Sequence, residues 1–155
     1  MASLRSVKRI LIAATLVLAG GWTPAAQATS QPPRAELTHD VCRQAQNPSR
    51  REISVTAVMR PLPGTEHMAI KFSLSRQAAG ARAFSPVRGG NLDKWVTPKD
   101  STLGQRAADI WRLGKVVSDL AGPAVYRLKV TFRWTDAHHR VLGRAVRNTP
   151  VCRAD

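Results

Sequence analysis

The run from Tyr126 to Trp134, which reads YRLKVTFRW, constrains the fold of this chain more than any other stretch. Apolar side chains occupy every second position, and basic residues or threonine fill the positions between them. A period of two residues is typical of a β-strand that buries one face in a protein core and exposes the other. The sequence therefore predicts a long, half-buried strand here.

The same alternation recurs in two other segments, and a third segment also predicts a strand; all three are bounded by turn-forming residues. Residues 51–60 and 67–76 flank the sequence PLPG, and two such runs across a short turn predict an antiparallel hairpin. Residues 141–148 follow the turn-forming sequence TDAHHR and predict a strand that returns beside the long one. In the irregular stretch between the second and third segments, we expect short strand pieces near residues 83–84 and 94–96.

The segment Gln105–Leu120 fits two kinds of secondary structure. Several of its apolar residues follow a helical spacing, whereas Trp111, Leu113 and Val117 also fit a strand. A glycine in the middle of the segment weakens the helix, and the neighbouring segments are strands. We therefore favour a strand, with a helix as the alternative.

Short strands separated by turns about every ten residues favour an all-β fold. We expect a single antiparallel β-sandwich of about seven strands over residues 38–155. Residues 29–37 are polar and rich in proline, which predicts a flexible lead-in before this domain.

The beginning of the chain has the features of a signal peptide. Basic residues precede the uncharged apolar run 10–21, and Ala26 and Ala28 fit the small-residue positions of a cleavage site. The apolar run is shorter than the ~20 residues that a membrane-spanning helix needs. We expect residues 1–28 to be removed, leaving a protein that is secreted or associated with the cell envelope and has no transmembrane segment; an uncleaved anchor is the alternative.

Two cysteines, Cys42 and Cys152, lie near the two ends of the predicted domain. An exported protein folds under oxidising conditions, where an even pair of cysteines favours a disulfide. Two free thiols are the alternative, but the chain lacks the CxxC spacing that is typical of redox sites. We therefore expect a Cys42–Cys152 disulfide.

Four residues before and within the long strand, Leu120, Gly122, Pro123 and Tyr126, resemble the tyrosine corner of immunoglobulin-like sandwiches. In fibronectin type III domains, similarly, a leucine lies about six residues before the tyrosine. The buried ring adds apolar area while its hydroxyl bonds an upstream backbone group. A plain strand tyrosine, without this role, is the alternative.

This resemblance implies an immunoglobulin-like topology, in which Leu120, Tyr126 and Trp134 have structural roles. Residues 42–153 also resemble a group of small exported bacterial proteins without an established activity. The chain has no cysteine pair on the second and sixth strands, so the resemblance implies a disulfide that ties the terminal segments together rather than bridging the sheets.

Motifs that would indicate catalysis are missing from the sequence. It contains no nucleophile elbow, zinc-protease helix motif or phosphate-binding glycine loop. The adjacent histidines His138 and His139 would diverge in a turn, so a solvated hairpin tip is the simpler interpretation than a metal site. We expect a protein without enzymatic activity, metal or cofactor.

The predicted domain contains three tryptophans, Trp95, Trp111 and Trp134. Trp134 continues the apolar face of the long strand, which predicts a core position. Trp95 lies in the irregular segment and is the best candidate for partial exposure, where it could stack on a sugar or base.

Basic residues outnumber acidic ones, with 24 Lys and Arg against 10 Asp and Glu and a formal net charge of +14. In an immunoglobulin-like sandwich the third, sixth and seventh strands share a sheet. The outward positions of the third and sixth strands carry four cations, and the returning strand adds Arg144 or Arg147 according to its register. The predicted basic set is Lys71, Arg127, Lys129, Arg133 and Arg144.

A basic sheet face attracts polyanions through long-range electrostatics that salt weakens. We therefore expect an exported, non-enzymatic binding module that contacts an anionic polymer of the cell envelope or another polyanion. The alternative is an accessory domain that acts through protein contacts along a strand edge. The plainer interpretation is a solvated face whose charges only blunt the sheet edges.

Overall fold

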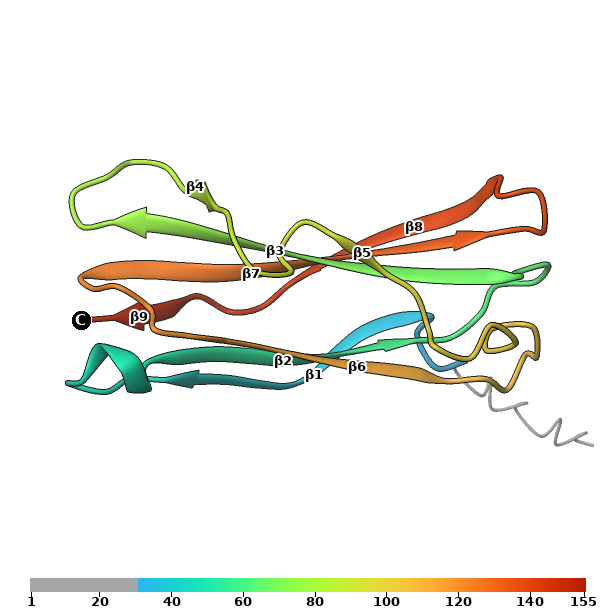
Figure 1. Ribbon diagram of the computed structural model, residues 1–155, viewed down its shortest axis with the longest axis horizontal. Helices are drawn as coiled ribbons and strands as arrows, with labels where there is room; N and C mark the ends of the chain where they lie inside the picture. Colours follow the sequence, from blue (N-terminus) through green and yellow to red (C-terminus); the bar gives the residue numbers. More distant parts are fainter. Residues whose placement is uncertain (1–30) are drawn as a thin grey trace, which may run out of the picture. The chain divides into compact units, whose positions relative to one another are not determined.

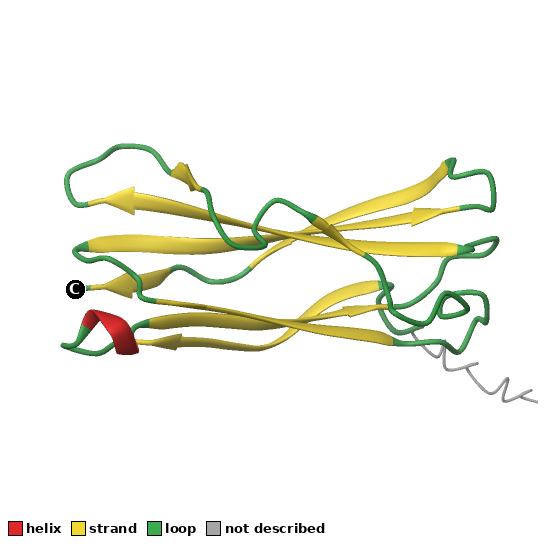
Figure 2. Cartoon of the chain, in the orientation of Figure 1, coloured by secondary structure: helices red, strands yellow, loops and turns green. Residues whose placement is uncertain are grey.

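A computed structural model describes residues 31–155, so the predicted signal peptide and its cleavage site lie outside the described residues. These residues form two antiparallel β-sheets that face each other (Figures 1 and 2). The elements are β1 (Ala35–Arg43), the short 3₁₀ helix η1 (Pro48–Arg50), β2 (Glu52–Met59), β3 (His67–Ala78), β4 (Ser85–Val87), β5 (Trp95–Val96), β6 (Trp111–Ser118), β7 (Ala124–Thr135), β8 (Val141–Asn148) and β9 (Cys152–Ala154). The all-β sandwich that the sequence predicts is confirmed.

The first sheet has the strand order β1-β2-β6, and the second has the order β4-β3-β7-β8. Two further strands join the second sheet, since β5 pairs with β3 and β9 pairs with β7. Residues 31–155 contain nine strands rather than about seven because β4 and β5 are separate short pairings and the returning strand is split around Pro150. Proline has no N–H to donate, so it interrupts a strand ladder.

The prediction that residues 51–60 and 67–76 form a hairpin is wrong. Strand β2 pairs with β1 and β6, whereas β3 pairs with β7 in the other sheet. Both strands bury a full apolar face, and the residues between Met59 and His67 carry the chain across the core from one sheet to the other. Stacked sheets lie about 10 Å apart, a distance that a tight two-residue turn does not cover.

The start of the domain and the extent of the strand within Gln105–Leu120 differ in detail from the predicted boundaries. Strand β1 begins at Ala35, which pairs with Met59 and is only 2 % exposed, so the end of the predicted lead-in is ordered strand and the domain starts before residue 38. Within Gln105–Leu120 the favoured strand is confirmed as β6, and the residues before Trp111 form turns. No helical segment of residues 31–155 has the length and apolar character needed to cross a membrane.

The core lies between the sheets and is built from the inward faces of β2, β3 and β7. Strand β7 contributes its whole alternating run, and the indole of Trp134 donates a hydrogen bond to the Arg60 carbonyl at 2.8 Å. The core position predicted for Trp134 is therefore confirmed. The most deeply buried side chains are Ile53, Val55, Met59, Met68, Ile70, Leu74, Leu128, Val130 and Phe132.

The corner between β6 and β7 has the contact expected of a tyrosine corner. The Tyr126 hydroxyl donates a hydrogen bond to the Ala121 carbonyl at 2.7 Å, and Tyr126 and Leu120 are each 3 % exposed. Because β6 and β7 belong to different sheets, this contact fixes the point where the chain crosses between them.

We expect Tyr126→Phe to lower the free energy of unfolding by about 1 kcal/mol, because the part-buried hydrogen bond to the Ala121 carbonyl is lost. Urea denaturation followed by tryptophan fluorescence measures the change, with an unaltered m-value as the sign of an unaltered unfolded state. An unchanged denaturation midpoint would mean that the hydroxyl is not what fixes the corner.

The Cys42–Cys152 disulfide is present, with a Cα–Cα distance of 5.4 Å and a sequence separation of 110. Cys42 lies in β1 and Cys152 in β9, so the bond joins the two sheets. The expectation that it would tie the termini without bridging the sheets is therefore wrong. The two terminal strands belong to opposite sheets, so the same bond ties the terminal segments together and bridges the sheets.

Candidate polyanion-binding face

The outward side chains of β7 form the middle of a basic surface. Arg127, Lys129 and Arg133 share the parity opposite to the buried core residues of this strand. Strand rise places every second residue about 6.7 Å apart, so the three cations follow a line along β7. On β3, Lys71 lies opposite Thr131 and faces the same way.

The register of β8 decides between the two arginines of the returning strand. Arg144 pairs with Arg133 and therefore lies on the outward face. Arg147 pairs with Val130, whose side chain is in the core, and its Nε donates to the Ala35 carbonyl at 3.2 Å across the sandwich edge. The structure thus brings all five predicted residues to one face. We call Lys71, Arg127, Lys129, Arg133 and Arg144 the basic face.

The outer face of the other sheet has a balanced charge. Its strand register places Glu36 and Glu52 outward, together with Arg43 and Arg112. Arg43 lies 3.9 Å from the Glu52 carboxylate. The excess positive charge on the strands is therefore concentrated on the second sheet.

The cations of the basic face have no carboxylate partner. Within residues 31–155, the ion pairs are Arg43–Glu52, Arg60–Glu36 and Arg140–Asp136. Asp93 lines the same surface hollow as Arg127 and Lys129, and it accepts a hydrogen bond from the Ser73 hydroxyl at 2.5 Å. The positive potential of the basic face is therefore largely uncompensated by its own side chains.

Two aromatic rings lie against these cations. Trp95 has its ring centroid 4.2 Å from Arg133 Cζ and 5.1 Å from Lys71 Nζ, and the Phe84 ring lies 4.9 Å from Arg127 Cζ. Cation–π contacts use the flat face of a guanidinium, whereas its N–H donors lie in the plane. The rings therefore hold Arg127 and Arg133 in position and leave in-plane donors for a ligand. Trp95 is partly exposed, as the sequence predicts.

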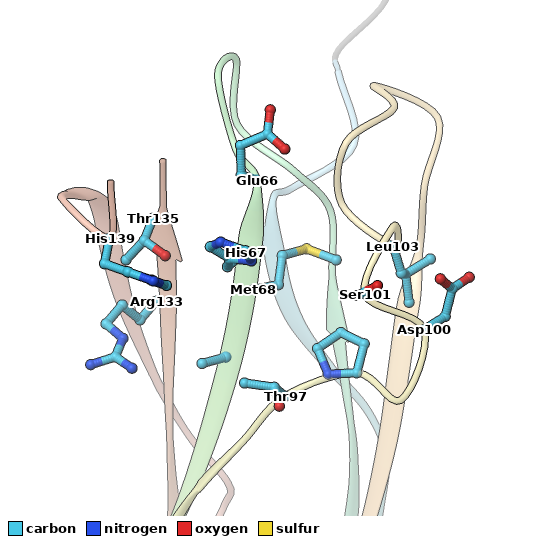
Figure 3. Close-up of a pocket in the computed structure, with 12 residues that line it drawn as sticks. Glu66, His67, Met68, Thr97, Asp100, Ser101, Leu103, Arg133, Thr135 and His139 are labelled. Atoms are coloured by element: carbon cyan, nitrogen blue, oxygen red, sulfur yellow. The ribbon is translucent and has the colours of Figure 1, made fainter. Parts of the chain in front are cut away.

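A cavity of about 250 Å³ lies at one end of the basic face (Figure 3). Strands β3 and β7 supply His67, Arg133 and Thr135, and the loop between β5 and β6 supplies the opposite wall with Ser101. His139, from the turn between β7 and β8, stacks on His67 with ring centroids 4.9 Å apart.

The histidine pair of the sequence analysis is therefore split. His139 stacks on His67 and lines the cavity, whereas His138 is not among the lining residues. In residues 31–155 there is no group of three or more metal-ligating side chains.

The turn that carries His139 is organised by Asp136. Its carboxylate accepts hydrogen bonds from the His138 and Arg140 backbone N–H groups and from Arg140 Nε. Desolvation raises the pKa of Asp136, but the hydrogen bonds from Arg140 and His138 outweigh it, so the pKa lies below the ordinary aspartate value. The Asp136 carboxylate therefore stays ionised at neutral pH and keeps accepting the hydrogen bonds that organise the turn.

The sequence patterns indicate neither the cavity nor the cation–π contacts. His67 and Thr135 stand at the outward parity of two predicted strands, so a correct β3–β7 register would have paired them. Ser101 and His139 come from loops whose paths no alternation pattern encodes. Trp95 beside Arg133 also depends on β5 joining β3, which only the tertiary fold determines.

Comparisons of the chain with protein-family models, with curated proteins and with solved structures find no match to any of them.

Proposed function

We propose that this protein is an exported, non-enzymatic binding module whose basic face contacts a phosphate-rich polymer of the cell envelope or another polyanion. The observation that carries the proposal is the alignment of five cations without carboxylate partners on one sheet, opposite a charge-balanced sheet. Polyanion binding by such a surface is driven by charge and by release of counterions.

Export is part of the same proposal. A disulfide between terminal strands is the kind of crosslink that persists in oxidising compartments, which supports a protein that is secreted or attached to the cell envelope. We also infer an immunoglobulin-like sandwich of the fibronectin type III kind. The Tyr126–Ala121 hydrogen bond and the placement of β3, β7 and β8 in one sheet support this inference.

Salt dependence tests the proposed function directly. If the five cations of the basic face each neutralise one phosphate of a flexible poly(glycerol phosphate) chain, the logarithm of the association constant should fall with the logarithm of salt concentration with a slope of about −3.5. Isothermal titration calorimetry between 50 and 300 mM NaCl would measure this slope. Binding that ignores salt, or an absence of binding at low salt, would contradict a charge-driven surface.

The second candidate function, protein contact along a strand edge, has one observation in its favour. Strand β8 is at the edge of its sheet and exposes Val141, Leu142 and Val146, each more than 40 % exposed. Edge strands can pair with a partner's extended segment. However, the Val146 carbonyl already accepts a hydrogen bond from Arg147 Nη1 of the same strand, which blunts this edge. We therefore favour the basic face.

A further inference from the structure

The cavity at the end of the basic face has a lining unlike the rest of that face. The hydroxyl groups of Thr97, Ser101 and Thr135 and the imidazoles of His67 and His139 surround it (Figure 3). Side chains with hydroxyl and imidazole groups can both donate and accept hydrogen bonds, so this set matches a ligand rich in hydroxyl groups.

The residues that line the cavity include one buried polar atom without a hydrogen-bond partner in the described part of the chain. Thr135, which lines the cavity beside Arg133, is only 8 % exposed. The Nε of Arg133 is buried and has no hydrogen-bond partner among residues 31–155. Buried polar groups are normally hydrogen-bonded, so unpartnered ones that line a cavity indicate a place for a polar ligand.

Apolar side chains supply the remaining wall. Met68, Pro98 and Leu103 line the cavity, and in Figure 3 Met68 and Leu103 lie on the side of the loop, opposite Arg133 and His139. A volume of about 250 Å³ lies below the range of drug-sized pockets, so one small unit rather than a longer segment fits. The carbon skeleton of a sugar or polyol suits a wall that mixes apolar and hydroxyl-bearing side chains.

Two residues with carboxylates, Glu66 and Asp100, also line the cavity. Asp100 accepts hydrogen bonds from the backbone and hydroxyl of Thr102 within its own loop. The Thr102 side chain, followed by its backbone N–H, holds the pKa of Asp100 below the ordinary value, so this carboxylate stays committed to the turn. In Figure 3 the Glu66 and Asp100 carboxylates point away from Arg133.

We propose that this cavity binds a single sugar or polyol unit that carries one phosphate or carboxylate, with the anionic group beside Arg133 and the hydroxyl groups toward Ser101 and Thr135. The inference rests on the proposed function, because the bound unit is the end unit of the polyanion that lies along the basic face. Arg133 belongs to both the cavity and the basic face, so one chain can pass from the first to the second.

Titration of the isotope-labelled protein with glycerol 1-phosphate and with glucuronate, followed by two-dimensional amide NMR, tests this site. We expect saturable shift changes at the amides of His67, Ser101 and His139. Neutral glycerol and glucose should bind with less than about a tenth of the affinity of the two anionic ligands. The anionic contact with Arg133 is worth at least about 1.4 kcal/mol, which corresponds to this tenfold difference.

Matched variants separate the cavity from its surroundings. Ser101→Trp fills the cavity from an exposed loop position and should lower the affinity for glycerol 1-phosphate at least about tenfold. Gln105→Trp, an exposed position of the same loop outside the cavity, should change it less than about twofold. Thr135→Val keeps the shape of the side chain and removes its hydroxyl, and it should lower the affinity for glycerol 1-phosphate about fivefold.

The outcomes distinguish this inference from the function on which it rests. If poly(glycerol phosphate) binds in a salt-dependent way but the small anionic units shift no amide of the cavity, the inference is overturned and the basic face stands. If neutral and anionic units bind equally, the assignment of the anionic group to Arg133 is overturned. If neither polymer nor unit binds, the proposed function itself fails.

Discussion

Replacing Cys42 and Cys152 together by alanine should lower the free energy of unfolding by about 4.7 kcal/mol. The disulfide closes a loop with a sequence separation of 110. Removing the crosslink raises the conformational entropy of the unfolded chain, which lowers the free energy of unfolding by the amount given above. A small domain has a total stability of about 5–15 kcal/mol, so the variant should be only marginally folded at 25 °C.

The structure adds a second reason for a large effect. The crosslink joins β1 to β9, which lie in opposite sheets, and Cys152 is only 1 % exposed. Loss of the bond therefore frees both terminal strands and removes buried sulfur from the core. Guanidinium denaturation of the double alanine variant measures the loss, and the reduced wild-type protein provides the matched control without any substitution. A loss below 1 kcal/mol in both samples would contradict this account.

The alternating runs could be predicted because each strand carries its pattern locally. Strands β2, β3 and β7 bury the residues that period-two alternation assigns to the core, and the Tyr126 corner follows from a motif of seven residues, Leu120 to Tyr126. Pairing between strands is not local. The connection after Met59 could close a hairpin or cross the core, and its sequence is compatible with both.

The candidate site shows the same division between local and non-local information. The outward cations of β7 were evident from parity alone, whereas the choice of Arg144 over Arg147 required the register of β8, which shifts between Trp134 and Thr135. The cavity brings together His67 and His139, which stand 72 positions apart in the chain and meet only because β3 pairs with β7. A single sequence carries no signal for a contact of that kind.

Reversing the charge of three basic-face residues, in the variant Arg127→Glu, Lys129→Glu and Arg133→Glu, should weaken binding of poly(glycerol phosphate) at least about 100-fold at 0.1 M salt. Each lost phosphate contact removes about 0.7 logarithmic units at this salt concentration, and the new carboxylates add repulsion. The slope of the logarithm of affinity against salt should fall from about −3.5 to about −1.4, because two cations remain.

The control variant changes the net charge by the same amount at a distance from the basic face. Arg50, Arg106 and Arg112 are exposed residues of η1, of the loop before β6 and of β6 itself. Their reversal should weaken binding less than about fivefold, since exposed charges beyond a Debye length are largely screened. Equal losses in the two triple variants would show that affinity follows net charge rather than the surface of one sheet.

Folding has to be separated from binding in this experiment, because Arg127 and Arg133 also stack on Phe84 and Trp95. Loss of two cation–π contacts at partly exposed positions costs about 1–2 kcal/mol, which an intact disulfide-linked sandwich should tolerate. Lys129→Glu alone alters an exposed side chain that makes neither contact, and it should still weaken binding about fivefold or more. A Lys129→Glu variant that binds as tightly as the wild type would remove the central cation of β7 from the binding surface, and with it the line of charges on which the proposed function depends.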